Sequence, residues 1–400
     1  MNTTKRVITL LLTCIFCALT TFAQKYPLST EDKERLNHAI ELVDQGQTDS
    51  SLIIIESLLK KYPKDYLVNY EYTYTLCQKG EFKKANKVLK KLEKYPEASD
   101  RLYQMIGNTY DYMGEPENAL KAYQRGLKKF PNSGPLYAEQ GNVYFNQSKY
   151  DDALSYYEKG VEVDPMYPTS YLRAATLYLS SNEPIWGMIY AEMFYLLKPL
   201  AKENSMLCNL TLKAMRDNFK MEGDSLHVTL THRNNIYWNS KKKDAKGLLD
   251  ALWSAYACFE IRYESVAGVS ARINGFKDTI DFNLFCKIRE GIADSLANTD
   301  YSCGLFKFHK KIIEAGFWEC YNMAIYNKAF PTEFEAFMAN EENVKKITSF
   351  MTWYNTIGDY PNPNEPTSSI VMERQLSQMK EKKLEEDTKK TEKKAPDEGK

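Results

Sequence analysis

Hydrophobic and polar positions in residues 32–201 repeat with a period of 34 residues. Glycines suited to a turn recur at Gly46, Gly80 and Gly114. Two columns of small residues follow the same period. They are Ala39, Thr73, Gly107, Gly141 and Ala175, and Ser51, Ala85, Ala119, Ala153 and Gly187. A fixed period of this length indicates a repeat architecture.

Each unit reads as two amphipathic helices joined by a turn. Tyr103, Ile106 and Tyr110 lie on one helical stripe, and Ala119 and Tyr123 lie on a second. Small residues recur where the helices cross, because only a small side chain lets two backbones approach closely. Each unit buries its apolar face only against a neighbour, which predicts a one-dimensional stack. The predicted units are 32–65, 66–99, 100–133, 134–167 and 168–201.

This pattern resembles the tetratricopeptide repeat family, and the third and fourth units match it best. The matching residues are Tyr103, Ile106, Gly107, Tyr110, Ala119, Tyr123 and Pro131, then Tyr137, Gly141, Tyr144, Tyr150, Ala153, Tyr157 and Pro165. The resemblance implies a right-handed superhelix of helix pairs. It also implies a concave groove that binds a peptide or helix of another protein, and it does not imply catalysis.

The same resemblance assigns the groove to the first helix of each unit. The residues it places there are Tyr70, Tyr74, Gln104, Asn108, Asp111, Tyr112, Ala138, Asn142, Phe145, Asn146, Leu172, Arg173 and Thr176. Asn108 and Asn142 occupy equivalent positions, and their amides could bond the backbone of an extended partner. The alternative is that these asparagines are solvated or bridge adjacent helices. Gln104 and Glu139 depart from the family members that clamp a terminal carboxylate, so we expect no such clamp.

The 34-residue register ends after Pro199. Residues 202–219 predict one further helix that covers the last repeat. Gly223-Asp224 then predicts a turn, and the alternation of Leu226, Val228 and Leu230 with polar residues predicts a short strand.

Residues 220–360 form a second, mostly helical domain that resembles no family we recognise. Helical periodicity marks 248–259, 282–292, 306–320 and 344–354, and Phe334 and Phe337 predict a short helix after Pro331. The fold class is therefore all-α dominated with a small β excursion.

This second domain shows no catalytic or metal-binding motif. His227 and His232 are five residues apart, which suits neither a strand nor a helix as a metal pair. Glu290 and Asp294 are expected on a solvated helix face, and His309 and the aromatic segment 317–321 in the core. We therefore expect no catalytic residue, metal or cofactor, with an enzyme active site in 220–360 as the alternative.

The first 23 residues predict a secretory signal peptide. Lys5 and Arg6 precede a short apolar run, and small residues lead to a cleavage site after Ala23. Lipidation at Cys14 or Cys17 and an uncleaved anchor are the alternatives. We therefore expect an exported protein of the bacterial periplasm or cell envelope, with no membrane span after cleavage.

Six cysteines remain after cleavage, and none forms a C-x-x-C pair, so zinc-ribbon and thioredoxin-like sites are not expected. An oxidising compartment permits a disulfide among the five cysteines after residue 200, with the pairing left open.

The chain balances 53 Lys and Arg against 53 Asp and Glu, and removing the signal leaves a net charge of about −2. A basic nucleic-acid-binding protein is therefore not expected. Residues 361–400 predict a Pro-rich linker and a charged disordered tail. Together these features predict an exported scaffold that binds another protein. A purely structural protein without a groove ligand is a further alternative.

Overall fold

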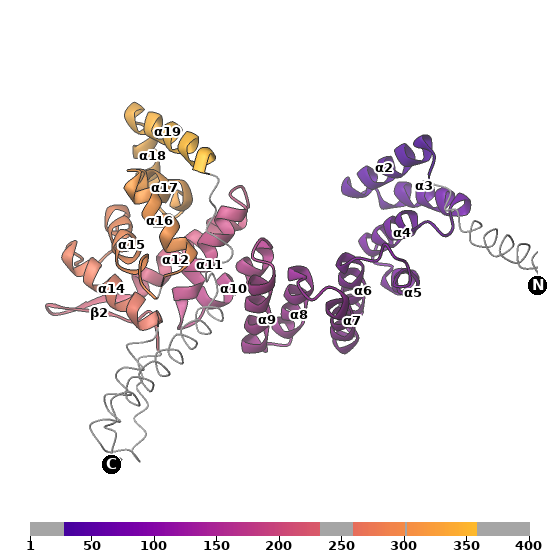
Figure 1. Ribbon diagram of the computed structural model, residues 1–400, viewed down its shortest axis with the longest axis horizontal. Helices are drawn as coiled ribbons and strands as arrows, with labels where there is room; N and C mark the ends of the chain where they lie inside the picture. The colour runs from indigo at the N-terminus through magenta and orange to yellow at the C-terminus, as the bar shows by residue number, and fades with distance from the viewer. Residues whose placement is uncertain (1–27, 233–258, 301, 358–400) are drawn as a thin grey trace, which may run out of the picture. The chain divides into compact units, whose positions relative to one another are not determined.

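A computed structural model describes residues 28–232, 259–300 and 302–357. The predicted signal peptide, Cys14, Cys17, Cys258, the tail 361–400 and nearly all of the stretch 248–259 lie outside the described residues. The chain divides into two compact units, and the boundary falls after Gly126. The described residues contain seventeen helices and one two-stranded sheet (Figure 1).

The N-terminal unit contains the first repeats. Its helices are α2 (Thr30–Asp44), α3 (Thr48–Lys61), α4 (Tyr66–Gln78), α5 (Phe82–Leu92), α6 (Asp100–Tyr112) and most of α7 (Pro116–Lys129). A serine or aspartate side chain caps two of these helices, α2 and α4. The Asp65 carboxylate, for example, accepts a hydrogen bond from Val68 N at the start of α4.

The C-terminal unit contains the remaining repeats and everything that follows them. Its helices and strands are α8 (Gly134–Asn146), α9 (Tyr150–Val163), α10 (Pro168–Leu179), α11 (Pro184–Leu197), α12 (Glu203–Asn218), β1 (Phe219–Glu222), β2 (Ser225–Val228), α14 (Phe259–Ile273), α15 (Phe282–Leu296), α16 (Gly304–Glu314), α17 (Trp318–Tyr326), α18 (Pro331–Met338) and α19 (Glu341–Ile357). These elements confirm the all-α fold class with a small β excursion.

Helix starts follow the 34-residue period. The second helices of the five units begin at Thr48, Phe82, Pro116, Tyr150 and Pro184, one period apart each time. First helices from the second unit onward keep the same spacing. The predicted helix pairs are therefore present along the whole of 32–201.

The turns between paired helices use the left-handed backbone region. Gly46, Gly80 and Gly114 have φ values of 77°, 82° and 75°, which glycine adopts without steric cost. Ser148 takes the same place in the fourth unit with φ 59°. The periodic glycines are thus explained by turn geometry.

One hydrophobic core runs through the C-terminal unit from Ala153 in α9 to Phe350 in α19. Helix α12 packs on α10 and α11, as expected for a capping helix, and also contacts α17 and β1. The last repeats and the helices after them therefore share a core.

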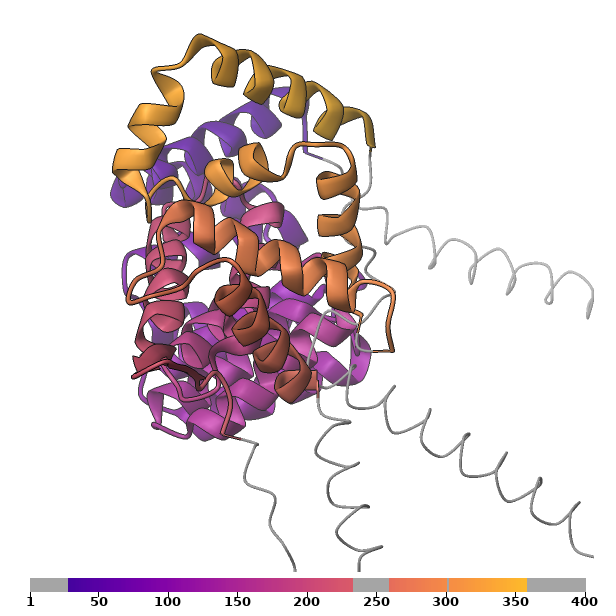
Figure 2. The ribbon, with the colours of Figure 1, turned by 90° about the vertical axis from the view of Figure 1, so that its left-hand side faces the viewer.

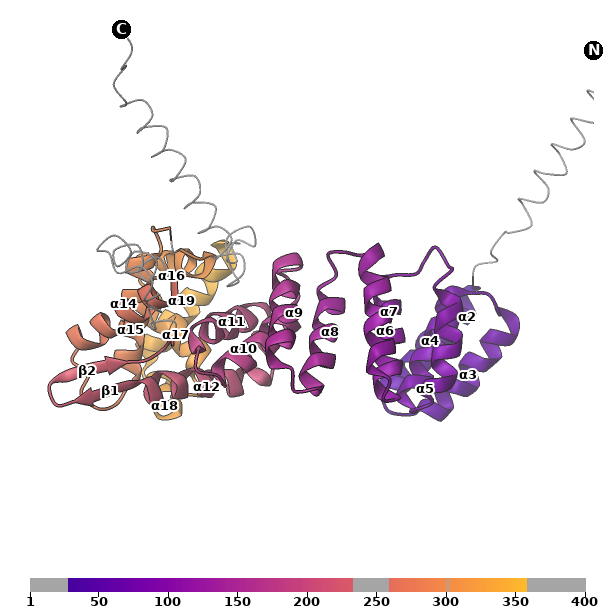
Figure 3. The ribbon, with the colours of Figure 1, turned by 90° about the horizontal axis from the view of Figure 1, so that it is seen from below.

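The β excursion is an antiparallel hairpin in which Met221 pairs with Leu226 around the turn at Gly223. Strand β1 contacts α12 and β2 contacts α14 (Figure 3). The sequence predicted only the second strand, and it extended the preceding helix to Phe219, which begins β1 instead. Polar Lys220 and Glu222 on the outer face gave β1 no apolar run to mark it.

The predicted helix over 306–320 is wrong in one respect, because the structure breaks it into α16 and α17. Gly316 stands between them with φ 75°, a conformation that a helix interior does not allow. The short helix after Pro331 is confirmed as α18. Helix α19 packs on α17 and α18 (Figure 2).

Candidate functional site

The two helices of the third repeat, α6 and α7, approach each other closely at Gly107. A Cβ atom added at Gly107 in α6 would lie 2.0 Å from the Tyr123 ring in α7, so only glycine fits. The Tyr123 hydroxyl donates a 2.6 Å hydrogen bond to Asn108 Oδ1. The asparagine next to the glycine thus joins the two helices of its own repeat.

The fourth repeat builds the same arrangement. A Cβ atom added at Gly141 would lie 2.4 Å from the Tyr157 ring, and the Tyr157 hydroxyl donates a 2.9 Å hydrogen bond to Asn142 Oδ1. Asn142 Nδ2 donates to Glu139 Oε2 at 2.9 Å. Burial raises the pKa of Tyr157 to about 12, so its hydroxyl remains a donor at neutral pH.

Both asparagine oxygens are therefore used inside the repeat. This arrangement matches the alternative in which Asn108 and Asn142 bridge adjacent helices. That Asn108 and Asn142 bind a partner stays a prediction. The more exposed residues of the predicted groove are better placed for that contact.

The predicted groove positions differ in exposure. Tyr112 is 70% exposed and Phe145 is 40% exposed. Asn146 and Arg173 are exposed as well, and the partly exposed positions are Tyr70, Tyr74, Gln104, Asp111, Leu172 and Thr176. Ala138 is buried at 1% exposure, so its assignment to the groove is wrong. Its small side chain instead lies on the packed face of α8.

Aromatic neighbours hold the exposed rings. Tyr112 stacks on Phe82 within the N-terminal unit, with ring centroids 4.8 Å apart. Phe145 meets Tyr150 edge to face at 5.5 Å within the C-terminal unit. Rings fixed in this way lose little rotamer freedom when a partner binds.

Two repeats are recognised by comparison with protein families. Models described as tetratricopeptide repeat match residues 100–132 and 135–167. These residues are tetratricopeptide repeats. They are also the two units that carry the Gly-Asn…Tyr arrangement, and no family model matches the C-terminal half.

Solved structures similar to this chain include tetratricopeptide proteins. The protein TTC0263 of Thermus thermophilus is 19% identical, with a TM-score of 0.39 over 45% of this chain and 99% of that one. YrrB, described as a tetratricopeptide protein with an unusual peptide-binding site, is 19% identical, with a TM-score of 0.31 over 43% of this chain and 87% of that one. No curated protein sequence matches the chain.

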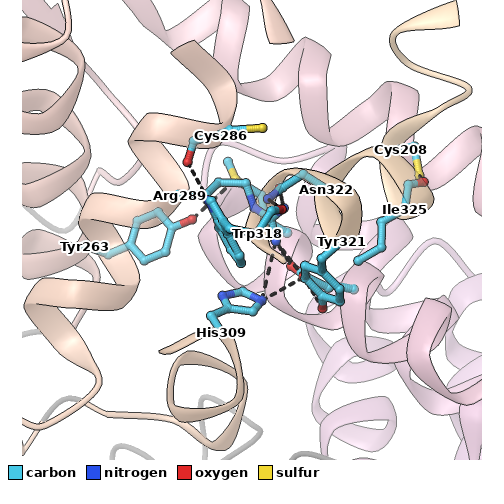
Figure 4. Close-up of polar contacts among 11 residues, drawn as sticks. Cys208, Tyr263, Cys286, Arg289, His309, Trp318, Tyr321, Asn322 and Ile325 are labelled. Carbon is cyan, nitrogen blue, oxygen red and sulfur yellow. Dashed lines mark hydrogen bonds and ion pairs between the residues drawn. The ribbon is translucent and has the colours of Figure 1, made fainter. Parts of the chain in front are cut away.

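A second candidate is a buried polar network in the C-terminal unit that joins α11, α15, α16 and α17 (Figure 4). Glu192 from α11 forms an ion pair with Arg289 from α15. The same carboxylate lies 2.7 Å from His309 Nε2 of α16 and accepts a 2.6 Å hydrogen bond from the Tyr321 hydroxyl of α17. Arg289 also donates to Asn322 Oδ1.

The network is electrostatically matched. Burial alone would raise the pKa of Glu192, but Arg289 and His309 hold it at about 2, so the carboxylate is charged at neutral pH. Burial lowers the pKa of His309 below its ordinary value. Neutral His309 is then a donor through Nε2–H, and Glu192 and Arg289 compensate each other's charge.

The space around this network is small. The cavity lined by Glu192, Thr211 and Arg289 has a volume of about 20 Å³, comparable with that needed by one water molecule. The network therefore offers no room for a substrate, and its geometry fits docking of α11 against α15, α16 and α17. The prediction that His309 is a satisfied core residue is confirmed.

Sequence reasoning missed Glu192 and Arg289. The available signal was a single carboxylate within the apolar helix 184–197. A buried charge of this kind requires a partner, although its position in the chain does not say which.

Other predicted features lie at the surface or in the core. Glu290 pairs with Lys287 at 2.8 Å and Asp294 pairs with Lys310 at 2.5 Å, as expected for a solvated face. Within 317–321, Trp318 is buried. The described cysteines are free thiols: Cys77, Cys208, Cys286, Cys303 and Cys320. Within the described ranges, no cluster of three or more His, Cys, Asp or Glu forms a metal site, and no helix is long and apolar enough to cross a membrane.

Proposed function

We propose that this protein is an exported scaffold of the bacterial cell envelope that binds a segment of another protein on the first-helix face of its repeats. The repeats themselves support an interaction role, since tetratricopeptide arrays present side chains from regularly spaced helices. The observation that carries the proposal is an exposed aromatic ring at the end of a first helix in each unit, Tyr112 of α6 in the N-terminal unit and Phe145 of α8 in the C-terminal unit. Tyr112 is 70% exposed although its ring stacks on Phe82, and Phe145 is 40% exposed beside Tyr150, which is itself 50% exposed.

The chemistry of this face favours an extended peptide or an amphipathic helix. Aromatic rings provide apolar contact area, and Asn146 and Arg173 provide hydrogen bonds at the margin. A nearly neutral mature chain argues for recognition by shape and side-chain contact, and against nucleic acid as the ligand. The predicted signal peptide supports the envelope as the place of action.

Site-specific photocrosslinking in intact cells tests the proposal. The photoreactive residue benzoylphenylalanine replaces Tyr112, Phe145 or Arg173 in the full chain. We expect Phe145 and Arg173, in the C-terminal unit, to crosslink to one envelope protein, and Tyr112, in the N-terminal unit, to crosslink to an envelope protein as well, each identified by mass spectrometry.

Matched controls carry the photoreactive residue on the exposed face of the second helices, at Gln124 in α7 and Ser155 in α9. These positions should give little of that product. Equal crosslinking from control and first-helix positions would contradict the assignment of the binding face. Recovery of the chain only in the cytoplasm would contradict export.

A further inference from the structure

The outer face of α5 carries a continuous stripe of lysines. Its residues are Lys83, Lys84, Lys87, Lys90, Lys91 and Lys94, the last lying just beyond the helix end. All six are exposed, whereas Ala85, Asn86, Leu89 and Leu92 fill the buried face. Because residues three and four apart share a helix face, the lysines line one side over about 16 Å. Helix α5 contains no acidic residue.

Little in the N-terminal unit neutralises this stripe. Lys84 lies 3.5 Å from Glu81 and over the Tyr72 ring, and Lys90 lies over the Tyr110 ring. Among the described residues, Lys83, Lys87, Lys91 and Lys94 have no acidic partner. Like charges at this spacing repel one another along a helix, and an acidic ligand would relieve that repulsion.

The positions of α11 that are equivalent to the α5 lysines pack against other helices. Three periods later, the equivalent residues of α11 are Ile185, Trp186, Ile189, Glu192, Met193 and Leu196. All six are buried. Trp186 donates a 3.0 Å hydrogen bond to Glu260 of α14, and Glu192 forms the ion pair with Arg289 of α15. The same face of a repeat is therefore a protein-docking surface within the C-terminal unit.

Two periods after α5, the equivalent face of α9 is largely acidic. Its residues are Asp151, Asp152, Ser155, Glu158, Lys159 and Glu162. The chemistry at these positions thus changes from unit to unit while the helix geometry is kept. The basic stripe is therefore specific to the second repeat and is not a general feature of the repeat fold.

We propose that the lysine stripe of α5 is a docking surface for an acidic segment of another protein. A helix of about three turns with Asp or Glu at three- and four-residue spacing matches the stripe in length and charge. A lipid surface fits less well, because membrane-surface helices combine basic residues with exposed large apolar ones. The exposed side chains of α5 are lysines alone.

Two sets of charge reversals test the proposal in the mature full chain. One set changes the stripe, Lys83→Glu, Lys87→Glu and Lys91→Glu. The control set changes three exposed lysines elsewhere in the same unit, Lys33→Glu, Lys60→Glu and Lys64→Glu. Both sets alter the net charge equally, and circular dichroism verifies that each variant is folded.

The probe is a fluorescent synthetic helix with glutamate at three- and four-residue spacing. We expect it to bind the wild-type chain at low salt, with affinity that falls as salt rises. The stripe variant should lose about tenfold or more in affinity, since three favourable charge contacts become repulsive. The control set should change affinity by less than about threefold.

Equal losses in both sets would overturn the proposal, because binding would then follow net charge. Stripe-dependent binding to vesicles of anionic phospholipid, without binding to the helix, would replace the acidic protein with a lipid surface. Replacing Phe145, which belongs to the C-terminal unit, by alanine should leave the probe affinity unchanged. Failure at the stripe is therefore distinguishable from failure of the first-helix binding face.

Carbodiimide crosslinking in intact envelopes gives a second measurement, since it joins a lysine amine to a carboxylate through an amide bond. We expect products that link Lys83, Lys87 or Lys91 to Asp or Glu of one partner. Lys→Arg variants at these three positions keep the charge and should lose the crosslink. Crosslinks spread evenly over all exposed lysines would contradict a specific surface.

Discussion

At the residue scale, Glu192 is a buried charge of the C-terminal unit with partners on three other helices. It is buried with Arg289, His309 and Tyr321, and each partner comes from a different helix. A buried carboxylate is costly unless its charge and its lone pairs are satisfied. This one carboxylate therefore specifies how α15, α16 and α17 meet α11.

His309 makes the stability of the C-terminal unit dependent on pH. Its pKa is lowered by burial from an ordinary value of 6.5. As the pH falls below about 6.5, the unfolded chain binds a proton that the folded chain resists, so stability decreases. Glu192 acts at lower pH: its stabilising contribution is present above about 4.5 and is lost as the pH falls toward about 2.

We expect His309→Gln to flatten the pH dependence between about 7 and 5.5, because glutamine still offers an N–H donor to Glu192 and does not titrate there. Urea unfolding at several pH values, followed by tryptophan fluorescence, measures this dependence. The control is His227→Gln, at a mostly exposed side chain. An unchanged slope in His309→Gln, or the same change in the control, would contradict the assignment.

At the element scale, the glycine and tyrosine of each central repeat form one packing unit. Gly107 admits the Tyr123 ring, and the ring brings its hydroxyl to Asn108. The second repeat solves the same crossing differently, with Thr73 and Leu89 at the equivalent positions. Both of these residues are buried. The helix pair thus requires complementary volumes and not a particular residue.

We expect Gly107→Thr to destabilise the N-terminal unit by about 1 to 3 kcal/mol, because the added side chain overlaps the Tyr123 ring. Adding Tyr123→Leu recreates the pair found in the second repeat and should restore much of that loss. Circular dichroism at 222 nm during thermal unfolding measures both variants. A double variant no more stable than Gly107→Thr would show that volume at this crossing does not decide stability.

The repeats could be predicted from sequence because each helix pair is local and the pattern recurs. The start of every second helix follows the period, and the turn glycines have the expected backbone conformation. The break at Gly316 was missed because apolar residues keep helical spacing on both sides of it. The Glu192–Arg289 pair spans 97 residues, and sequence reasoning has no rule that pairs distant charges. The sequence also could not decide the role of Asn108, because an asparagine there is compatible both with solvation and with a hydrogen bond from Tyr123.

At the scale of the whole molecule, the chain forms two compact units, and helix α7 continues across their boundary after Gly126. Among the residues that the structure describes, the N-terminal unit has two small hydrophobic clusters, whereas the C-terminal unit has one large cluster. Repeat stacks depend on nearest-neighbour contacts, and each unit has its own hydrophobic clusters, so we expect the two units to unfold separately. All five tryptophans follow residue 126, so tryptophan fluorescence reports on the C-terminal unit.

We therefore expect destabilisation in one unit to leave the other largely unchanged. Arg289→Met leaves Glu192 buried without its counter-ion and should destabilise the C-terminal unit by about 3 to 5 kcal/mol. That loss should appear in urea unfolding followed by tryptophan fluorescence. Replacing both charges, as Glu192→Leu with Arg289→Met, should cost less than Arg289→Met alone.

The matched change in the N-terminal unit is Asp32→Asn. The Asp32 carboxylate accepts hydrogen bonds from Lys61 at 2.5 Å and Tyr62 at 2.8 Å, which joins the start of α2 to the end of α3. We expect faster hydrogen exchange in residues 30–62 and an unchanged tryptophan transition. If Asp32→Asn lowers the tryptophan transition as Arg289→Met does, the two units unfold as one cooperative body. If the two units are independent, their changes contribute additively, and the variant combining both changes should show both effects at full size.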